Sequence, residues 1–244
     1  MSMTKRIAVV TGAARGIGLA ISKKLLADGL TVVGVDVNER VLRESAESLP
    51  FTPYVADLTD AAQVRAVFAK VAQQFGGVDV LVNNAGTCFL TDFVEILPAE
   101  FRQQMAINFD SAFYCCQQAI PLMLPRPGIK KIVNISSNGA YNFEVFDPAH
   151  YRASKAAMDT MTKHLARQYA TQGIAVNSIA PAMTRTDLFD TVTPDILATA
   201  LAGMPRGDAM QPSEIAAWVA FLISPAGDCS SGNVIILNQG RDVR

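Results

Sequence analysis

Short apolar runs rich in valine and isoleucine recur along the chain, separated by segments whose apolar residues repeat with a helical spacing. Runs of this length without a polar face are typical of strands buried on both sides. Several helical segments end at glycine, a common stop signal for a helix. The predicted strands cover residues 7–11, 31–36, 52–56, 78–83, 132–136, 174–180 and 234–237, and the clearest predicted helices cover 17–27, 61–75, 100–123 and 151–171.

The alternation of strands and helices predicts the fold class. Successive strands joined by helices form right-handed crossovers, which place the strands parallel in one sheet and the helices on both of its faces. We therefore expect a single-domain, doubly wound α/β fold of the Rossmann type over residues 1–244. The most irregular stretch, residues 183–212, is interpreted as a lid over a ligand site within that domain.

Composition narrows the function classes. The 244 residues are 50% hydrophobic and 18% charged, with a formal net charge of -1 and no long lysine or arginine run. Nucleic acid and membranes are therefore not expected as partners. The N-terminus has no room for a secretory leader, so a cytoplasmic location is expected. Four cysteines without a CxxC spacing and two histidines give no usual metal site, and Cys115 and Cys116 are interpreted as packed thiols.

The first predicted strand runs into a glycine-rich turn, residues 11–18, inside which the next helix begins. Gly12 suits a turn closed to other residues, Gly16 admits a pyrophosphate close to the backbone, and Gly18 allows close packing of helix on strand. Phosphates would lie at the helix N-terminus, where free amides and the helix dipole favour anions. The spacing GxxxGxG departs from the common GxGxxG, so a structural turn without a ligand is the alternative.

Asp36, at the end of the second strand, indicates which cofactor is bound. A carboxylate here accepts hydrogen bonds from the adenosine ribose and repels a 2′-phosphate, which favours NAD over NADP. Arg15 is the opposing signal, because a cation beside the phosphate loop suits NADP, although it could also be a solvated residue at the helix start. Asp36 could instead cap the following helix.

Tyr151 and Lys155 are four residues apart on a predicted helix, so their side chains share a face. A nearby ammonium lowers the pKa of a tyrosine, and a shift from about 10 towards 7 corresponds to roughly 4 kcal/mol. Tyr151 could then act as a general acid or base near neutral pH. Ser137 follows a predicted strand at the sheet edge where α/β folds bind ligands, and its hydroxyl could donate to a substrate oxygen.

These features together resemble the short-chain dehydrogenase/reductase family, nearly from end to end. The motifs occur in the family's order: residues 11–18, Asp36, Asp57-Leu58, Asn83-Asn84-Ala85-Gly86, Asn108, Ser137, Tyr151 to Lys155, and Pro181 to Thr186. The resemblance implies hydride transfer between a nicotinamide cofactor, NAD preferred, and a small-molecule secondary alcohol or ketone. It also implies a homo-oligomer, usually a tetramer built on the long middle and catalytic helices.

The resemblance assigns roles to residues. Ser137 would orient the substrate, Tyr151 would exchange the proton, Lys155 would also hold the nicotinamide ribose, and Asn108 would bind a water that relays protons from Lys155. Asp57 would contact adenine, and Asn84 would steady the phosphate loop. The full set of expected cofactor-binding residues is Gly12, Arg15, Gly16, Ile17, Gly18, Asp36, Asp57, Leu58, Asn84, Ala85, Gly86, Tyr151, Lys155, Pro181, Thr184 and Thr186.

Some positions depart from the family pattern or allow other interpretations. Ala182 replaces a usual glycine, and Asn238-Gln239 replace Asp-Gly near the C-terminus, which puts the packing of the chain end in doubt. A hydrolase triad of Ser137, His150 and Asp147 lacks the GxSxG elbow. A nucleotide sensor without turnover is the alternative function.

The substrate pocket is expected to be partly apolar, with loop packing as the alternative interpretation of the same side chains. Sugars or polyols, hydroxy acids, steroids and 3-oxoacyl thioesters all stay open as substrates. The residues expected to shape the pocket are Phe89, Tyr141, Phe143, Phe146, Leu188, Phe189 and Met204.

Overall fold

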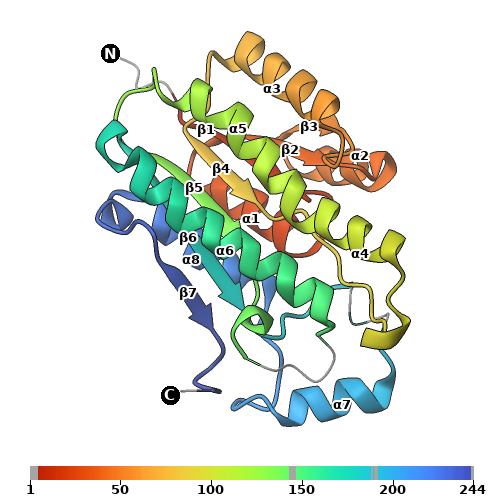
Figure 1. Cartoon of the computed structure of the whole chain (residues 1–244). Helices are drawn as coiled ribbons and strands as arrows, with labels where there is room; N and C mark the ends of the chain where they lie inside the picture. Colours follow the sequence, from red (N-terminus) through yellow and green to blue (C-terminus); the bar gives the residue numbers. More distant parts are fainter. Residues whose placement is uncertain (1–4, 143–146, 188, 190–191, 243–244) are drawn as a thin grey trace.

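The computed structural model describes residues 5–142, 147–187, 189 and 192–242. Within these residues seven parallel strands form one sheet in the order β3-β2-β1-β4-β5-β6-β7 (Figure 1). The predicted doubly wound α/β fold is confirmed. The strands are β1 (Ile7–Thr11), β2 (Thr31–Asp36), β3 (Thr52–Val55), β4 (Val80–Asn83), β5 (Lys130–Ile135), β6 (Ile174–Pro181) and β7 (Val234–Leu237).

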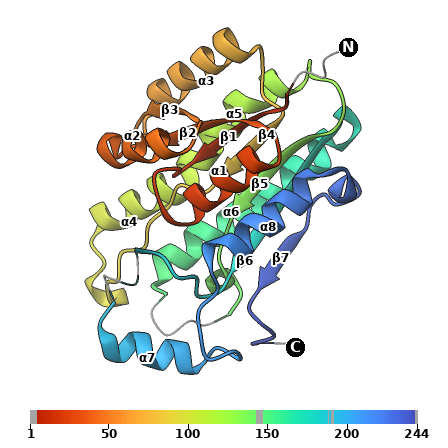
Figure 2. The same ribbon diagram turned by 180° about the vertical axis from the view of Figure 1, so that it is seen from behind.

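Helices cover both faces of the sheet (Figures 1 and 2). One layer holds α1 (Gly16–Ala27), α2 (Glu39–Ser48) and α8 (Pro212–Ile223), and the other holds α3 (Ala61–Phe75), α5 (Ser111–Met123) and α6 (Ala149–Tyr169). Beyond the carboxyl edge of the sheet lies α7 (Pro194–Ala202) (Figure 1). The remaining elements are α4 (Pro98–Met105), the π-helical η2 (Ala106–Asp110), and the short 3-10 helices η1 (Phe93–Glu95), η3 (Asn138–Ala140), η4 (Ala170–Gln172) and η6 (Pro225–Gly227).

The apolar runs become strands because each run supplies both faces of the sheet. In β1, Ala8 and Val10 belong to the core under α1 and α8, whereas Ile7 and Val9 belong to the core under α3 and α5. All four side chains are buried. Successive side chains of a strand point to opposite faces, so only an uninterrupted apolar run can fill both cores.

The strand order reverses between β1 and β4, and this reversal positions the ligand site. The chain builds β1, β2 and β3 outward in one direction and then returns to place β4 on the other side of β1. The loops after β1 and β4 therefore diverge and open a crevice at the carboxyl edge. The two strand ends are joined by Thr11 Oγ1, which accepts hydrogen bonds from the amides of Asn84 (2.9 Å) and Ala85 (3.0 Å).

Two predicted segments differ in the structure. The single helix expected over residues 100–123 is divided into α4, η2 and α5, because the π turn Ala106–Asp110 inserts an extra residue per turn beside Asn108. The stretch 183–212, expected to be irregular, contains α7, and a bridge between Thr184 and Met210 closes its base. Periodicity identifies a helix but does not distinguish an α turn from a π turn.

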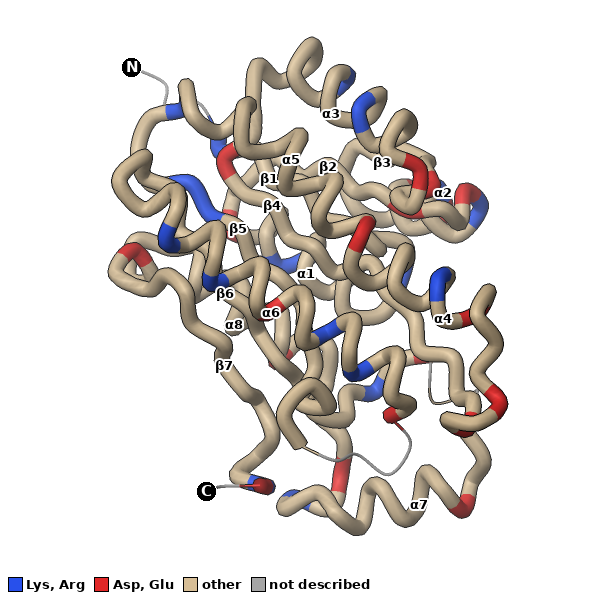
Figure 3. The backbone as a smooth tube through the Cα atoms, in the orientation of Figure 1, with Lys and Arg blue, Asp and Glu red and all other residues tan. Residues whose placement is uncertain are grey.

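Charged residues of both signs are distributed along the chain (Figure 3), and two of the cysteines lie in the core. Lys and Arg positions are interspersed with Asp and Glu positions along the backbone trace (Figure 3). In the described part of the chain, no helix is both long and apolar enough to cross a bilayer. Cys115 and Cys116 are buried free thiols, as predicted. Burial raises the pKa of Cys116 to about 12, which makes it unreactive at neutral pH.

Candidate active site

A cavity of about 1120 Å³ opens at the carboxyl edge of the sheet. This volume suits a dinucleotide together with a small substrate. Two of the expected site residues, Gly18 and Asn108, lie behind its wall and are buried. The expected residues that line the cavity are Gly12, Arg15, Gly16, Ile17, Asp36, Asp57, Leu58, Asn84, Ala85, Gly86, Ser137, Tyr151, Lys155, Pro181, Thr184 and Thr186.

The loop after β1 forms a cradle that requires glycine. Gly12 and Gly16 have positive φ angles of 63° and 56°, a conformation that side chains disfavour. A Cβ on Gly18 would lie 2.0 Å from the carbonyl oxygen of Gly12, so α1 approaches the loop at backbone distance. The Asn84 amide group holds the loop by donating to the carbonyls of Thr11 (3.0 Å) and Gly12 (3.1 Å).

The N-terminus of α1 opens onto this cradle. Arg15 is the N-cap residue and has no side-chain acceptor for the first-turn amides. A Cβ on Gly16 would meet nothing closer than Thr186 Cγ2, at 3.5 Å, which leaves room at the loop surface. Unsatisfied amides at the positive end of a 12-residue helix attract anions, so the residues present fit the phosphates of a nucleotide.

Asp36 lies at the end of β2 on the cavity wall. Its Oδ2 accepts from the amide of Ala14 (3.0 Å) and its Oδ1 accepts from the amide of Asn38 (2.9 Å). The alternative role of Asp36 as a helix cap is wrong, because Asn38 is the N-cap of α2 and accepts from the amide of Val41. Arg15 forms an exposed ion pair with Asp187 at 3.1 Å.

Further along the wall, Asp57 follows β3. Its Oδ1 accepts from the amide of Thr59 at 2.9 Å and from the Thr59 hydroxyl at 2.7 Å. Leu58 is buried beside it. These contacts fix the Asp57 carboxylate at the end of the cavity next to Asp36, where both residues contribute to the lining.

Tyr151 and Lys155 lie one turn apart on α6 and face the cavity together. The Lys155 ammonium is 5.9 Å from the centre of the Tyr151 ring and donates to the carbonyl of Ile135 at 2.8 Å. Burial lowers the pKa of Lys155 to about 8, partly offset by the negative charge of Asp159. At pH 7 the ammonium form still dominates by about ten to one. A positive charge at this position favours the phenolate form of Tyr151.

Ser137 caps the 3-10 turn after β5, and its Oγ accepts from the amide of Gly139 at 3.1 Å. The hydroxyl proton of Ser137 can still be donated into the cavity. Asn108 lies behind this region, where its side chain bonds both backbone groups of Thr87 and the Ser154 hydroxyl. A side-chain Cβ at position 86 would lie 3.3 Å from Asn108 Oδ1 and 3.4 Å from Lys155 Nζ. Gly86 therefore lies beside both of these polar groups.

A buried polar network beneath Lys155 was missed by sequence reasoning. The Asp159 carboxylate accepts from the hydroxyls of Ser136 (2.8 Å) and Tyr141 (2.9 Å) and is almost fully buried. Burial raises the pKa of Asp159, opposed by these hydrogen bonds and by Lys155. The available signal was the spacing, since Asp159 follows Lys155 by four residues and shares its helix face.

Several pocket and catalytic expectations are corrected by the structure. His150 is buried, and its Nε2 lies 3.1 Å from a carboxylate oxygen of Glu100, so it does not act as a base for Ser137. The hydrolase triad is therefore excluded.

The expected pocket residues are only partly confirmed. Tyr141 bonds Asp159 instead of lining the cavity, and Met204 is part of the core. Phe89 and Phe189 do line the cavity. Phe143, Phe146 and Leu188 lie outside the described residues.

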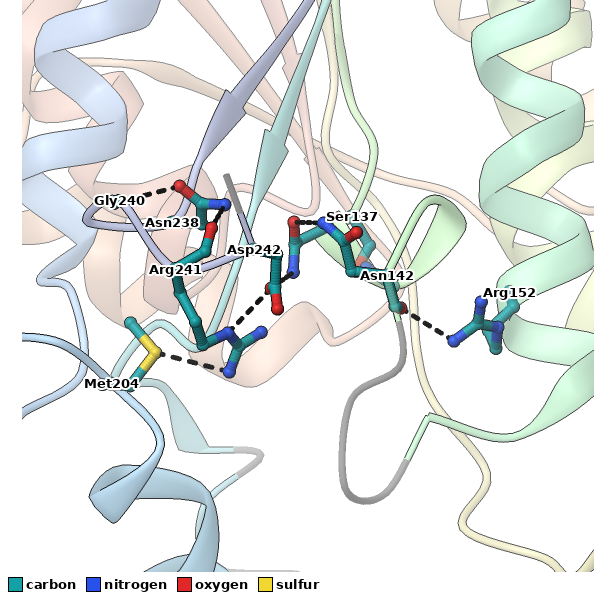
Figure 4. Close-up of polar contacts among 10 residues, drawn as sticks. Ser137, Asn142, Arg152, Met204, Asn238, Gly240, Arg241 and Asp242 are labelled. Carbon is teal, nitrogen blue, oxygen red and sulfur yellow. Dashed lines mark hydrogen bonds and ion pairs between the residues drawn. The ribbon is translucent and has the colours of Figure 1, made fainter. Parts of the chain in front are cut away.

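The C-terminal segment after β7 packs against the substrate end of the site (Figure 4). Asp242 accepts from the side chain of Asn138, next to Ser137, at 3.5 Å, and Arg241 donates to Asp242 at 2.9 Å. Arg241 also reaches the sulfur of Met204, just after α7, at 3.7 Å. The Asn238 side chain bonds the carbonyl of Arg241. Where the sequence departs from the family pattern, the chain end thus connects α7 to the Ser137 loop.

The fold and this site define a class: an α/β protein with a dinucleotide cradle at the reversal point of its sheet and a tyrosine–lysine pair at the far end of that cradle. A family model described as enoyl-(acyl carrier protein) reductase matches residues 12–242. The chain is 33% identical to a 3alpha-hydroxysteroid dehydrogenase of Mediterraneibacter gnavus, over 96% of each protein. It is also 33% identical to the 3-oxoacyl-(acyl-carrier-protein) reductase FabG of Thermotoga maritima, over 98% of this chain and 99% of that protein.

A solved structure gives the same result. A short-chain dehydrogenase/reductase from Brucella melitensis, described as a glucose/ribitol dehydrogenase, superposes with a TM-score of 0.92 at 32% identity and covers 100% of both chains. The chain belongs to the short-chain dehydrogenase/reductase family, whose members are oxidoreductases that use a nicotinamide cofactor. The family resemblance predicted from the motifs is confirmed.

Proposed function

We propose that this protein transfers a hydride between NAD and a small-molecule secondary alcohol or ketone, with Tyr151 as the general acid or base. The observation that carries the proposal is the arrangement of Ser137, Tyr151 and Lys155 along one cavity wall. A hydroxyl donor, a phenol and a buried ammonium beside a nucleotide cradle can bind an oxygen and exchange its proton.

Each group has a distinct task in this reaction. The bound cofactor would accept or supply the hydride at the substrate carbon. Ser137 donates to the substrate oxygen and holds it near Tyr151. Tyr151 takes the hydroxyl proton during oxidation and returns it during reduction. Lys155, held by the Ile135 carbonyl at 2.8 Å, keeps a positive charge near the phenol and so stabilises the charge that develops there.

NAD is the proposed cofactor in preference to NADP. The Asp36 carboxylate lines the cavity at the end of β2, where a 2′-phosphate would meet its negative charge. The next residue, Val37, supplies no compensating cation. Arg15, the residue that could favour NADP, forms an exposed ion pair with Asp187.

A substrate screen tests the function. Purified protein is mixed with NAD or NADP and a panel of secondary alcohols, and with the reduced cofactors and the matching ketones, while the near-ultraviolet absorbance of reduced nicotinamide is followed. We expect turnover with NAD and secondary alcohols. Tight NAD binding without turnover of any compound would instead favour a nucleotide sensor.

The pH dependence of ketone reduction should show the effect of the Asp159 carboxylate, which lies beneath Lys155. We expect Asp159→Asn to lower the pKa of Lys155 below its value of about 8, because the carboxylate that opposes the burial effect is removed. Ketone reduction, which needs the ammonium, should therefore lose rate at a lower pH than in the wild type. Burial raises the pKa of Cys88, the other group acting on Lys155, to about 12, so it stays neutral in this range.

Pre-steady-state or steady-state rates of ketone reduction across pH measure this shift. Tyr141→Phe is the matched control, since it removes one hydrogen bond to Asp159 and leaves the carboxylate in place. An alkaline limb that is the same in Asp159→Asn and the wild type would contradict the prediction. The homo-oligomer expected from the family, usually a tetramer, stays a prediction. Size-exclusion chromatography with light scattering would measure the number of subunits.

A further inference from the structure

Gln239, just after β7, has a backbone conformation that residues with a side chain disfavour. Its φ is 59°, in the left-handed region where residues other than glycine, asparagine and aspartate are uncommon. Such a conformation persists only where the surrounding structure holds it. Leu237 pairs with Pro181 at the end of β6, so Gln239 emerges beside the segment that follows β6.

The side-chain amide of Gln239 forms two hydrogen bonds with a loop that is distant in the sequence. Its Oε1 accepts from the backbone amide of Arg206 at 3.0 Å, and its Nε2 donates to the backbone carbonyl of Asp208 at 3.0 Å. Because both bonds reach the backbone, they restrain the path of the chain at residues 206–208. The ion pair of Arg206 with Glu214 joins two exposed side chains and contributes little by comparison.

Residues 206–210 in turn hold the segment that follows β6. The amide of Met210 donates to the carbonyl of Met183 at 2.9 Å, and the amide of Arg185 donates to the carbonyl of Met210 at 2.8 Å. Thr184 forms a parallel bridge with Met210. The position of residues 183–186 therefore depends on a loop that Gln239 restrains.

The segment after β6 faces the nucleotide cradle. Met183, Thr184 and Thr186 line the cavity, whereas Gln239 does not. A Cβ on Gly16 would lie 3.5 Å from Thr186 Cγ2, so this segment closely approaches the glycine loop. A dinucleotide in the cradle would contact the segment, and any freedom of residues 183–186 would be lost on binding, at a cost in affinity.

We propose that Gln239 is a positioning residue for cofactor binding. Its amide group holds residues 206–208, this loop holds residues 183–186, and the cavity wall is thereby ordered before the cofactor arrives. An ordered wall loses less conformational entropy on binding, so the affinity for NAD and NADH is higher. This inference rests on the proposed function, since it takes the cavity as the site of the nicotinamide cofactor.

Limited proteolysis of the protein without cofactor tests the restraint. Trypsin cleaves after Arg206, inside the restrained loop, and the cleavage rate follows the population of the open conformation. Gln239→Gly removes both hydrogen bonds and suits the positive φ. We expect cleavage after Arg206 to become roughly 3- to 30-fold faster, the lower part of the range for two neutral hydrogen bonds. Mass spectrometry of the fragments over time measures the rate at each site.

Cofactor affinity tests the consequence of the restraint. We expect the dissociation constant of NADH, measured by fluorescence titration, to rise by a similar factor in Gln239→Gly. The kcat at saturating NAD should change less, because Gln239 contacts neither the cofactor nor the reacting groups. Faster cleavage with an unchanged dissociation constant would overturn the proposal. A wild-type protein that binds NADH but oxidises no alcohol would refute the proposed function and leave this test intact.

Asp242→Gly is the matched control for relief of backbone strain. Asp242 has the same φ of 59°, but its carboxylate accepts from Asn138 and Arg241 instead of bonding residues 206–208. This variant should leave cleavage after Arg206 and the dissociation constant of NADH close to their wild-type values. The same acceleration of cleavage in Asp242→Gly and Gln239→Gly would contradict the role of the Gln239 amide.

Gln239→Asn is a second test of the side chain. Asparagine suits the left-handed region, but its shorter side chain cannot reach both backbone groups. Cleavage after Arg206 should again be faster than in the wild type. Wild-type cleavage rates in both Gln239 variants, or equal acceleration at trypsin sites throughout the chain, would overturn the proposal.

Discussion

Replacing Tyr151 with phenylalanine should lower kcat/KM by roughly 10²- to 10⁴-fold, the usual contribution of a positioned general acid or base. The change removes one oxygen and leaves the aromatic ring against Lys155, 5.9 Å away. The glycine loop, Asp36 and Asp57 are untouched, so the dissociation constant for NAD should stay close to the wild-type value. Steady-state kinetics with the best alcohol from the screen and fluorescence titration with NADH measure the two effects.

Tyr169→Phe is the control for this variant. Tyr169 lies at the last turn of the same helix, α6, and does not line the cavity. Its loss of a hydroxyl should leave turnover unchanged. Kinetics of Tyr151→Phe that match the wild type would end the proposed mechanism, because no other phenol among the described residues lines the cavity.

Removing the charge of Asp36 should change the cofactor preference. In Asp36→Asn the one remaining side-chain oxygen can accept from the amide of Ala14 or from that of Asn38 but not from both, and the repulsion of a 2′-phosphate is lost. Charge-assisted hydrogen bonds to the ribose are weakened at the same time. We expect the ratio of kcat/KM for NAD to that for NADP to fall by roughly 10- to 100-fold. Parallel assays with both cofactors on one alcohol provide the measurement.

Asp57→Asn is the matched control, since it neutralises another carboxylate of the same cavity wall. It should lower the affinity for both cofactors to a similar extent and leave their ratio in place. A wild-type protein that already prefers NADP would contradict the role assigned to Asp36. A ratio unchanged in Asp36→Asn would place the selection elsewhere in the loop.

The sequence was most informative where a property depends on neighbouring residues. The extent of β1 was predicted to the residue, because five consecutive buried side chains form an apolar run that no other local structure explains as well. Tyr151 and Lys155 could be placed on one helix face from their spacing alone. The turn at Gly12 was predicted because glycine adopts backbone conformations that residues with a Cβ disfavour, and its φ is positive in the structure.

The local sequence pattern was insufficient where contacts with a distant segment of the chain decide the structure. The π turn at Asn108 accompanies bonds from this side chain to Thr87, 21 residues earlier, so the apolar period of the helix gave no sign of it. The sequence offered Asp36 as a possible cap of the following helix, because Asp satisfies the local rule, whereas Asn38 is the cap in the structure. The amide of Ala14, 22 residues before Asp36, engages that carboxylate in the structure.

The sequence alone determined the order of strands and helices, the class of fold and the motifs of a nicotinamide site, because backbone conformation and burial follow from short-range periodicity and from glycine positions. The tertiary structure alone decided that Asp159 lies under Lys155 with Ser136, that His150 meets Glu100, and that Asp147 adjoins Ser137. These pairs form because the sheet brings the ends of separate strands to one edge. Distance in space, which sets every charge and hydrogen bond of the site, is not encoded in any single stretch of the chain.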